Sequence, residues 1–209
     1  MAGGRPRGFD ITQALNQAID VFMAKGYDGA TLADLTSAMG INPPSFYAAF
    51  GSKEGLFRQV VASYGEERDI LLESALSAPT ATEAVERFLR ESVADQTRPD
   101  RAHGCLYIQG ALVCGTQGEQ VREPLTKARL AGYKPLAARF KVAQSTGEIA
   151  PEVDPDSLAR YVCALVHGLA VQAASGATRK QLCCVIEMTM NTWAATIAGT
   201  PGKKARSSS

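Results

Sequence analysis

A tight turn at residues 39–42 (Met-Gly-Ile-Asn) constrains this chain more than any other feature of its sequence. Gly40 can adopt the positive φ that ends one helix, and Asn42 can cap the next helix, whose first residue is Pro43. Thr31 is a suitable N-cap for the helix before the turn, and Ser52 for the helix that follows. These signals predict three short helices within residues 11–50 that form a helix-turn-helix.

Apolar residues recur at helical spacing through most of the remaining chain, and no strand-like alternation appears. We expect further helices over residues 52–76, 82–96, 105–114, 119–145, 156–175 and 179–198, with kinks or a break in residues 119–145 at Pro124, Gly132 and Pro135. The prediction is an all-α fold of about nine helices. It divides into a basic arm (1–9), a helix-turn-helix domain (10–56), a larger helical domain (57–198) and a tail (199–209).

The composition excludes several classes of protein. No apolar run approaches the roughly eighteen residues of a membrane span, and no secretory signal follows the first residues, so a cytoplasmic protein without membrane contact is expected. Five cysteines without a C-x-x-C pair, together with two histidines, do not form a zinc or disulfide pattern. No nucleotide, metal or nucleophile motif of an enzyme occurs, so neither catalysis nor a cofactor is expected.

Two segments resemble a known family. Residues 22–35 (FMAKGYDGATLADL) are similar to the first-to-second helix signature of TetR-type transcriptional regulators, and residues 45–56 (SFYAAFGSKEGL) to their recognition helix and the start of their fourth helix. The resemblance covers residues 10–60 without a gap. It implies a homodimeric repressor that binds double-stranded operator DNA with an inverted repeat and is released by a small-molecule inducer in the larger domain.

The resemblance also implies roles for individual residues. Phosphate contacts fall on Thr31, Tyr47 and Lys53, and base-edge contacts on Asn42, Pro44, Ser45 and Ala48. Ala48 and its neighbour Ala49 keep the recognition helix slim enough for a major groove about 12 Å wide. Arg5 and Arg7 could reach the adjacent minor groove. Residues 1–58 carry five basic and five acidic side chains, so binding would depend on local placement of charge.

The larger domain offers candidates for a ligand pocket and a dimer interface. The pocket candidates are the polar and aromatic residues of the middle helices: Tyr107, Gln109, Cys114, Tyr133, Phe140, His167 and Gln172. The dimer candidates are apolar residues of the last two helices, which form a four-helix bundle in the family: Leu158, Val162, Leu165, Leu169, Ile186, Met190, Trp193 and Ile197. We interpret Phe46 and Phe50 as core residues of the helix-turn-helix.

Two alternatives stay open. Cys105 follows His103-Gly104 at an expected helix start, where the helix dipole favours the thiolate, so the protein could be a thiol- or electrophile-responsive regulator. The other interpretation of Cys105 is a small core residue. The zero net charge of the first 58 residues also allows a TetR-like module that binds a ligand or partner without specific DNA binding.

Overall fold

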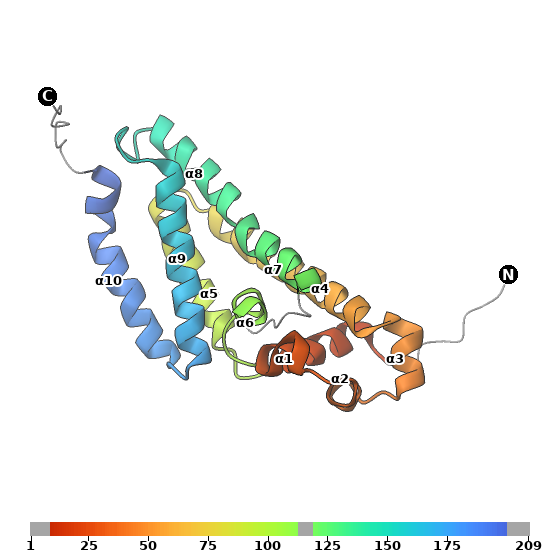
Figure 1. The fold of residues 1–209 in the computed structure, drawn as a ribbon. Helices are drawn as coiled ribbons and strands as arrows, with labels where there is room; N and C mark the ends of the chain where they lie inside the picture. The colour runs from red at the N-terminus through yellow and green to blue at the C-terminus, as the bar shows by residue number, and fades with distance from the viewer. Residues whose placement is uncertain (1–8, 113–118, 200–209) are drawn as a thin grey trace, which may run out of the picture.

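The computed structural model describes residues 9–112 and 119–199, and in this part of the chain every regular element is a helix (Figure 1). The ten helices are α1 (Ile11–Gly29), α2 (Leu32–Met39), α3 (Pro43–Phe50), α4 (Lys53–Leu76), α5 (Ala81–Gln96), α6 (Leu106–Leu112), α7 (Glu119–Ala131), α8 (Tyr133–Ser145), α9 (Pro155–Ala174) and α10 (Arg179–Ala198). The all-α prediction is therefore confirmed.

The helix ends follow the capping residues. Thr31, Asn42 and Ser52 each accept a hydrogen bond from the backbone N–H three residues on, as predicted, and Gly40 has a φ of 62°. Gly26 has a φ of 68° and kinks α1, which resumes for one more turn to Gly29. The expected helix over residues 119–145 divides at Gly132 into α7 and α8.

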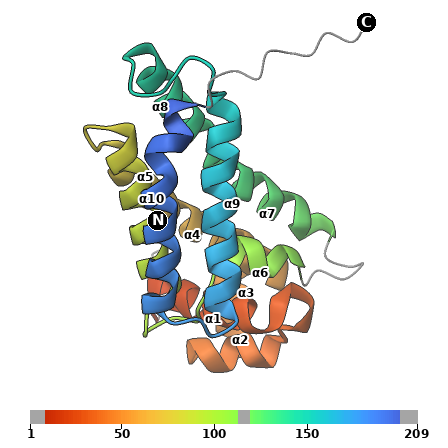
Figure 2. The same ribbon diagram turned by 90° about the vertical axis from the view of Figure 1, so that its left-hand side faces the viewer.

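The helices form two regions joined by α4. Helices α1, α2 and α3 lie at one end of the molecule, and α4 runs from them along its length (Figure 1). Helices α9 and α10 lie next to each other on the face turned toward the viewer in Figure 2. Two helices connect the α1–α3 end with the α9–α10 face. Helix α6 lies against α1, and α5 packs against α4, α9 and α10.

Two apolar clusters make up the core. The first contains the buried residues of α1–α3 together with Leu56, Phe57, Val60 and Tyr64 of α4, and it extends into α6. The second joins α5, α8, α9 and α10 around Phe140 and Trp193. The first part of α4 therefore packs in the helix-turn-helix core, past the expected boundary at residue 56.

Helix α9 is long and apolar enough to cross a membrane by length and composition, and within the described residues it alone meets this criterion. Its inner face packs against α5 and α8, and Leu158, Val162 and Leu169 are buried there. These contacts bury one face of α9, while Tyr161 and Val171 stay exposed on another.

Candidate nucleic-acid interface and internal cavity

The starts of α2 and α3 are fixed by local hydrogen bonds. Thr31 Oγ1 accepts from Asp34 N at 3.1 Å, and Asp34 Oδ2 accepts from Thr31 N at 3.0 Å, which closes a capping box. Asn42 Oδ1 accepts from Ser45 N at 2.9 Å and fixes the start of α3. The sequence thus sets the direction of α3 through short-range contacts, independently of the larger domain.

Helix α3 has one buried face and one solvent-exposed face. Phe46 and Phe50 are buried, which confirms their interpretation as core. The opposite face exposes Asn42, Pro44, Tyr47 and Ala48, with Ser45 half-buried at its edge. Tyr47 is 53% exposed although its ring is large and apolar. A narrow exposed face ending in a phenol fits a helix that enters a groove and contacts phosphate.

Lys53 stands at the start of α4, beside this face. Its ammonium lies 4.6 Å from the centre of the Tyr27 ring, which places the charge by a cation–π contact. Partial burial lowers the pKa of Lys53, and the nearby Asp28 carboxylate opposes that shift. Thr31 thus stands at the start of α2, Lys53 at the start of α4, and the other predicted contacts on α3 or its N-cap: Asn42, Pro44, Ser45, Tyr47 and Ala48. Arg5 and Arg7 lie outside the described residues.

Other charges of this region are already paired. Lys25 Nζ lies 2.6 Å from Asp34 Oδ1, and this contact, with the hydrogen bonds from Thr31, lowers the pKa of Asp34 to about 2. Arg58 Nη2 contacts Glu54 Oε1 at 2.6 Å on the next turn of α4. A DNA phosphate would therefore meet the Lys53 ammonium and the helix N-termini more readily than these paired cations.

The larger domain contains a cavity of about 470 Å³. Its walls come from α4, α5, α7 and α9 and from the start of α6. Of the predicted pocket residues, Tyr107 and His167 line this cavity, and Cys105 lines it too. Burial, and secondarily Arg129, lowers the pKa of His167, so its imidazole is neutral at neutral pH.

The remaining pocket candidates lie elsewhere. Gln109 Oε1 accepts from Cys105 N at 3.0 Å, and Tyr133 donates to Asp156 at 2.9 Å under the Arg160 guanidinium. Phe140 is buried against Trp193 in the second core cluster, and Gln172 lines a separate groove on α9. Cys114 lies outside the described residues. Gln109, Tyr133 and Phe140 have structural partners that periodicity alone does not reveal.

Sequence reasoning missed seven polar residues of the cavity: Glu66, Arg68, Asp69, Ser92, Gln96, Lys127 and Arg129. Ser92 and Gln96 are 1% and 2% exposed. They follow Val85 and Leu89 on the buried side of α5, and a polar pair continuing an apolar stripe is the signal that could have identified them. Arg68 stands on α4 with its Nη1 2.8 Å from Asp95 Oδ2.

The expected dimer residues need correction. Leu158, Val162, Leu169, Ile186 and Trp193 are at most 4% exposed within the single subunit, so a partner has little of them left to contact. Leu165, Met190 and Ile197 are half-buried. The large apolar residues that α9 and α10 leave exposed are Tyr161, Val171, Val185 and Met188, on the helices that face the viewer in Figure 2. The most apolar stripe of each helix packs inward, since that buries the larger area.

Comparison with known proteins gives a consistent result. Residues 14–60 match the family model "Bacterial regulatory proteins, tetR family", and residues 81–186 match "Tetracyclin repressor-like, C-terminal domain". The chain is 30% identical over 188 residues to the HTH-type transcriptional repressor BdcR of Escherichia coli K12, covering 88% of this chain and 89% of BdcR. It is 28% identical over 198 residues to the repressor ComR of the same organism, covering 91% of each chain.

A solved structure extends this similarity to a DNA complex. A cysteine mutant of the TetR family transcriptional regulator CifR, complexed with 26bp double-strand operator DNA, superimposes with a TM-score of 0.84 at 40% identity. The match covers 90% of this chain and all of the CifR chain. A putative TetR transcriptional regulator from Rhodococcus sp. RHA1 is also 40% identical, with a TM-score of 0.61 over 88% of this chain and 99% of its own.

Proposed function

The chain belongs to the TetR family of DNA-binding transcriptional regulators, and on that premise we propose that it is a homodimeric repressor whose inducer binds in the α4–α9 cavity. It acts in the cytoplasm on an inverted-repeat operator, with one α3 helix in each half-site. Its relatives are regulators of transcription, and catalysis has no part in the proposal.

The proposal that the protein binds DNA rests on the solvent-exposed outer face of α3. Asn42, Pro44, Tyr47 and Ala48 are exposed on that face, while Phe46 and Phe50 on the opposite face are buried in the core. The CifR relative, which is 40% identical over nearly the whole chain, was solved on operator DNA. Ala48 offers a methyl group for contact with thymine, and DNA shape would supply further readout.

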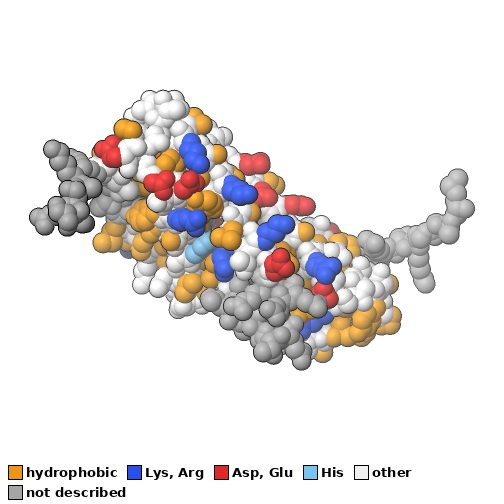
Figure 3. All heavy atoms as spheres, turned by 45° about the horizontal axis from the view of Figure 1, so that its top comes forward, with side chains coloured by type: hydrophobic (Ala, Val, Ile, Leu, Met, Phe, Trp, Pro, Cys, Tyr) orange, Lys and Arg blue, Asp and Glu red, His pale blue; other side chains and the backbone are white. Residues whose placement is uncertain are grey.

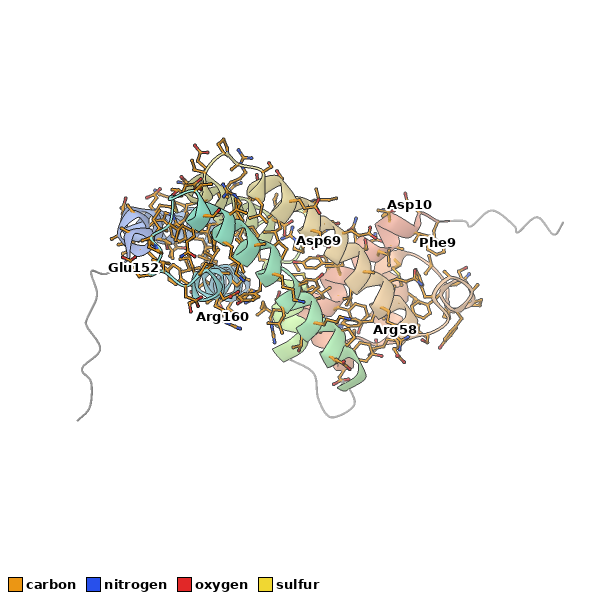
Figure 4. All side chains as sticks on the ribbon, turned by 90° about the horizontal axis from the view of Figure 1, so that it is seen from above. Phe9, Asp10, Arg58, Asp69, Glu152 and Arg160 are labelled. Carbon is orange, nitrogen blue, oxygen red and sulfur yellow. The ribbon has the colours of Figure 1, made fainter. Side chains whose placement is uncertain are left out.

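Helix α4 offers a route from the cavity to the DNA-binding region. Phe57 packs in the first core cluster, whereas Gly65, Asp69 and Leu72 line the cavity further along the same helix. Figure 4 shows Arg58 near the DNA-binding end of α4 and Asp69 farther along it. A ligand that displaces α4 would therefore move the helix-turn-helix, and a preference of about 1–3 kcal/mol for one state gives a coupling of roughly 5- to 150-fold.

A second contact joins the same parts. Arg101, in the loop between α5 and α6, donates to Glu67 Oε2 of α4 at 2.8 Å and to Asn16 Oδ1 of α1 at 2.9 Å. The next residue, Ala102, donates its backbone N–H to Asp20 of α1 at 2.7 Å. Because this loop leads directly into Cys105 and Tyr107 of the cavity wall, its displacement would also reach α1.

The dimer would form through α9 and α10. Tyr161 and Val185 line a groove of about 330 Å³ on this face, and Met188 is 71% exposed. Exposed apolar side chains of this kind mark contact surfaces. Pairing two copies through these helices would present both α3 helices on the same side of the dimer.

The test is a fluorescence anisotropy titration of the purified protein against the DNA upstream of its own coding sequence, with salt varied. We expect saturable, nanomolar binding that an unlabelled copy competes and random DNA does not. Ala48→Glu, which places a carboxylate in the groove, should abolish it, whereas Ala138→Glu on the exposed surface of α8 should not. Binding that stays weak and indifferent to sequence, also after selection from random DNA, would contradict the proposal and favour the module without specific DNA binding.

The position of Cys105 favours a second candidate for the signal that releases the regulator from DNA. Its side chain lines the cavity and lies beside the Tyr64 hydroxyl, so a reactive molecule in the cavity would meet a thiol. In this version the regulator responds to thiol or electrophile chemistry. Cys105→Ser would then abolish release from DNA by an oxidant or electrophile while leaving operator affinity unchanged, and a retained response would exclude it.

A further inference from the structure

The last turn of α1 places an aromatic ring beside the start of α4. Gly26 has a φ of 68° and interrupts the regular course of α1, and Tyr27 follows directly after this kink. The Tyr27 ring stacks on Phe22, with centroids 6.1 Å apart and planes at 15°, and meets Phe57 edge-on at 5.0 Å. Phe22 and Phe57 are buried and contact each other edge-on at 4.9 Å. Two core side chains therefore fix the orientation of the Tyr27 ring.

The Tyr27 ring contacts the Lys53 ammonium. Lys53 Nζ lies 4.6 Å from the ring centre, within the range of about 6 Å for a cation–π contact. Tyr27 belongs to α1, and Lys53 is the first residue of α4, so the contact joins the end of one helix to the start of another. Both side chains are half-buried, which leaves part of each open to a molecule that approaches from solvent.

A held lysine binds phosphate at a smaller entropic cost than a free one. The ammonium of lysine stands on a flexible stem of four carbons, and fixing it only in the complex removes rotamer freedom and lowers affinity. The Tyr27 ring restricts Lys53 already in the free subunit. Part of this entropic cost is therefore met when the protein folds, before DNA binds.

The placement of single cations matters on this protein. Within residues 9–58 the other two cations are paired, Lys25 with Asp34 and Arg58 with Glu54. Figure 3 shows Lys and Arg side chains scattered among Asp and Glu over one face of the molecule, and the coloured side chains form no basic patch there. Such a surface attracts DNA weakly at long range, so affinity depends on how individual cations such as Lys53 are held.

From these contacts we propose that Tyr27 is a positioning residue for DNA binding, which holds the Lys53 ammonium in place for a backbone phosphate. The proposal rests on the proposed function for the phosphate contact of Lys53, whereas the contact between the two side chains belongs to the free subunit. Tyr27 acts through the face of its ring, so phenylalanine at this position should do the same and an aliphatic side chain should not.

The first test needs no DNA. Protons above the face of an aromatic ring resonate upfield, so the Lys53 Cε protons should be shifted upfield in the parent protein and in Tyr27→Phe, and not in Tyr27→Leu. Lys53→Met identifies the signal, because the signal disappears in that variant. An unshifted Lys53 signal in the parent protein would overturn the proposal, and this outcome does not depend on whether any Tyr27 variant folds.

Anisotropy titrations then measure the effect on DNA binding. A phosphate contact does not depend on base sequence, so we would use a random duplex at low salt and, separately, the duplex upstream of the coding sequence. Tyr27→Leu should weaken binding to both about threefold per subunit, and so about tenfold for the dimer. Tyr27→Phe should bind within twofold of the parent protein.

The matched control is Tyr133→Leu. Tyr133 also forms a cation–π contact, with Arg160 at 4.7 Å, but it lies on α8 in the larger domain, so its loss should leave DNA binding unchanged. Thermal unfolding shows whether each variant is folded, and Tyr27→Met replaces Tyr27→Leu if the latter is not.

A double-mutant cycle separates positioning from general damage to the fold. In a Lys53→Met background there is no ammonium to hold, so Tyr27→Leu should weaken binding by less than twofold further. An equal loss in both backgrounds would mean that the ring only supports the helix-turn-helix core, and it would overturn the proposal, as would parent-like binding by Tyr27→Leu. A Tyr27 effect on the random duplex without preference for the upstream duplex would support the positioning role and contradict specific operator recognition.

Discussion

The Arg101 contact should contribute more to stability than any exposed ion pair of this chain. The Arg101 side chain is 7% exposed and donates to both carboxylate oxygens of Glu67, at 2.8 and 3.3 Å, and to Asn16. It therefore joins α1 and α4 to the loop before α6. Arg101→Met removes the three hydrogen bonds and keeps most of the aliphatic stem.

The size of the effect follows from burial. A hydrogen bond to a charged group contributes about 1.5–3 kcal/mol net. The Glu67 side chain is 35% exposed, so water can solvate its carboxylate once Arg101 is gone. This reduces the energetic cost of leaving the Glu67 charge without a partner. We expect the free energy of unfolding to fall by about 2–3 kcal/mol, which corresponds to roughly 5–10 °C in Tm for a protein of this size.

The measurement is urea and thermal unfolding at one fixed protein concentration, because Tm of a dimer depends on concentration. Arg90→Met is the matched control: Arg90 forms a single pair with Glu86, both are more than 40% exposed, and the expected loss is below about 0.5 kcal/mol. A double-mutant cycle with Glu67→Gln should give a coupling energy of about 1 kcal/mol or more. Additive single effects, or equal losses in Arg101→Met and the control, would refute the reasoning.

Further predictions concern the DNA-binding region. Lys53→Met should weaken operator binding across sequences and reduce the salt slope by about one, and an unchanged slope would remove Lys53 from the phosphate contacts. Gly55→Ala would drive a Cβ into the Phe50 carbonyl oxygen, so it should lower Tm by several degrees, whereas Gly132→Ala meets only an ordinary contact at 3.7 Å and should not. The Asp34 carboxyl should titrate near pH 2 by NMR, and because its folded pKa is depressed, its stabilising contacts are present above about pH 4 and are lost as the pH falls toward 2.

Local signals in the sequence account for the helix-turn-helix. Thr31, Asn42 and Ser52 cap helices within three residues of themselves, and Gly40 supplies the positive φ between α2 and α3. Such contacts depend on neighbours in the chain, so they can be read without a tertiary structure. The spacing of Phe46 and Phe50 likewise separates the buried face of α3 from the face that carries Tyr47.

The cavity and the dimer face required the tertiary structure. Whether Tyr107 faces the cavity while Tyr133 binds Asp156 depends on which helices pack beside them, and periodicity identifies only that both lie in apolar surroundings. Arg68 and Gln96 come from different helices, and only the packing of α4 against α5 shows that both residues line one cavity.

The sequence by itself determined the helix-turn-helix, the N-caps of α2, α3 and α4, and the family, because these depend on contacts within a few residues. Only the tertiary structure decided which stripe of α9 and α10 fills the subunit core and which remains for a partner. Both stripes are apolar, and the choice depends on how much area each buries against α5 and α8, a quantity that is a property of the packed helices and not of any one of them.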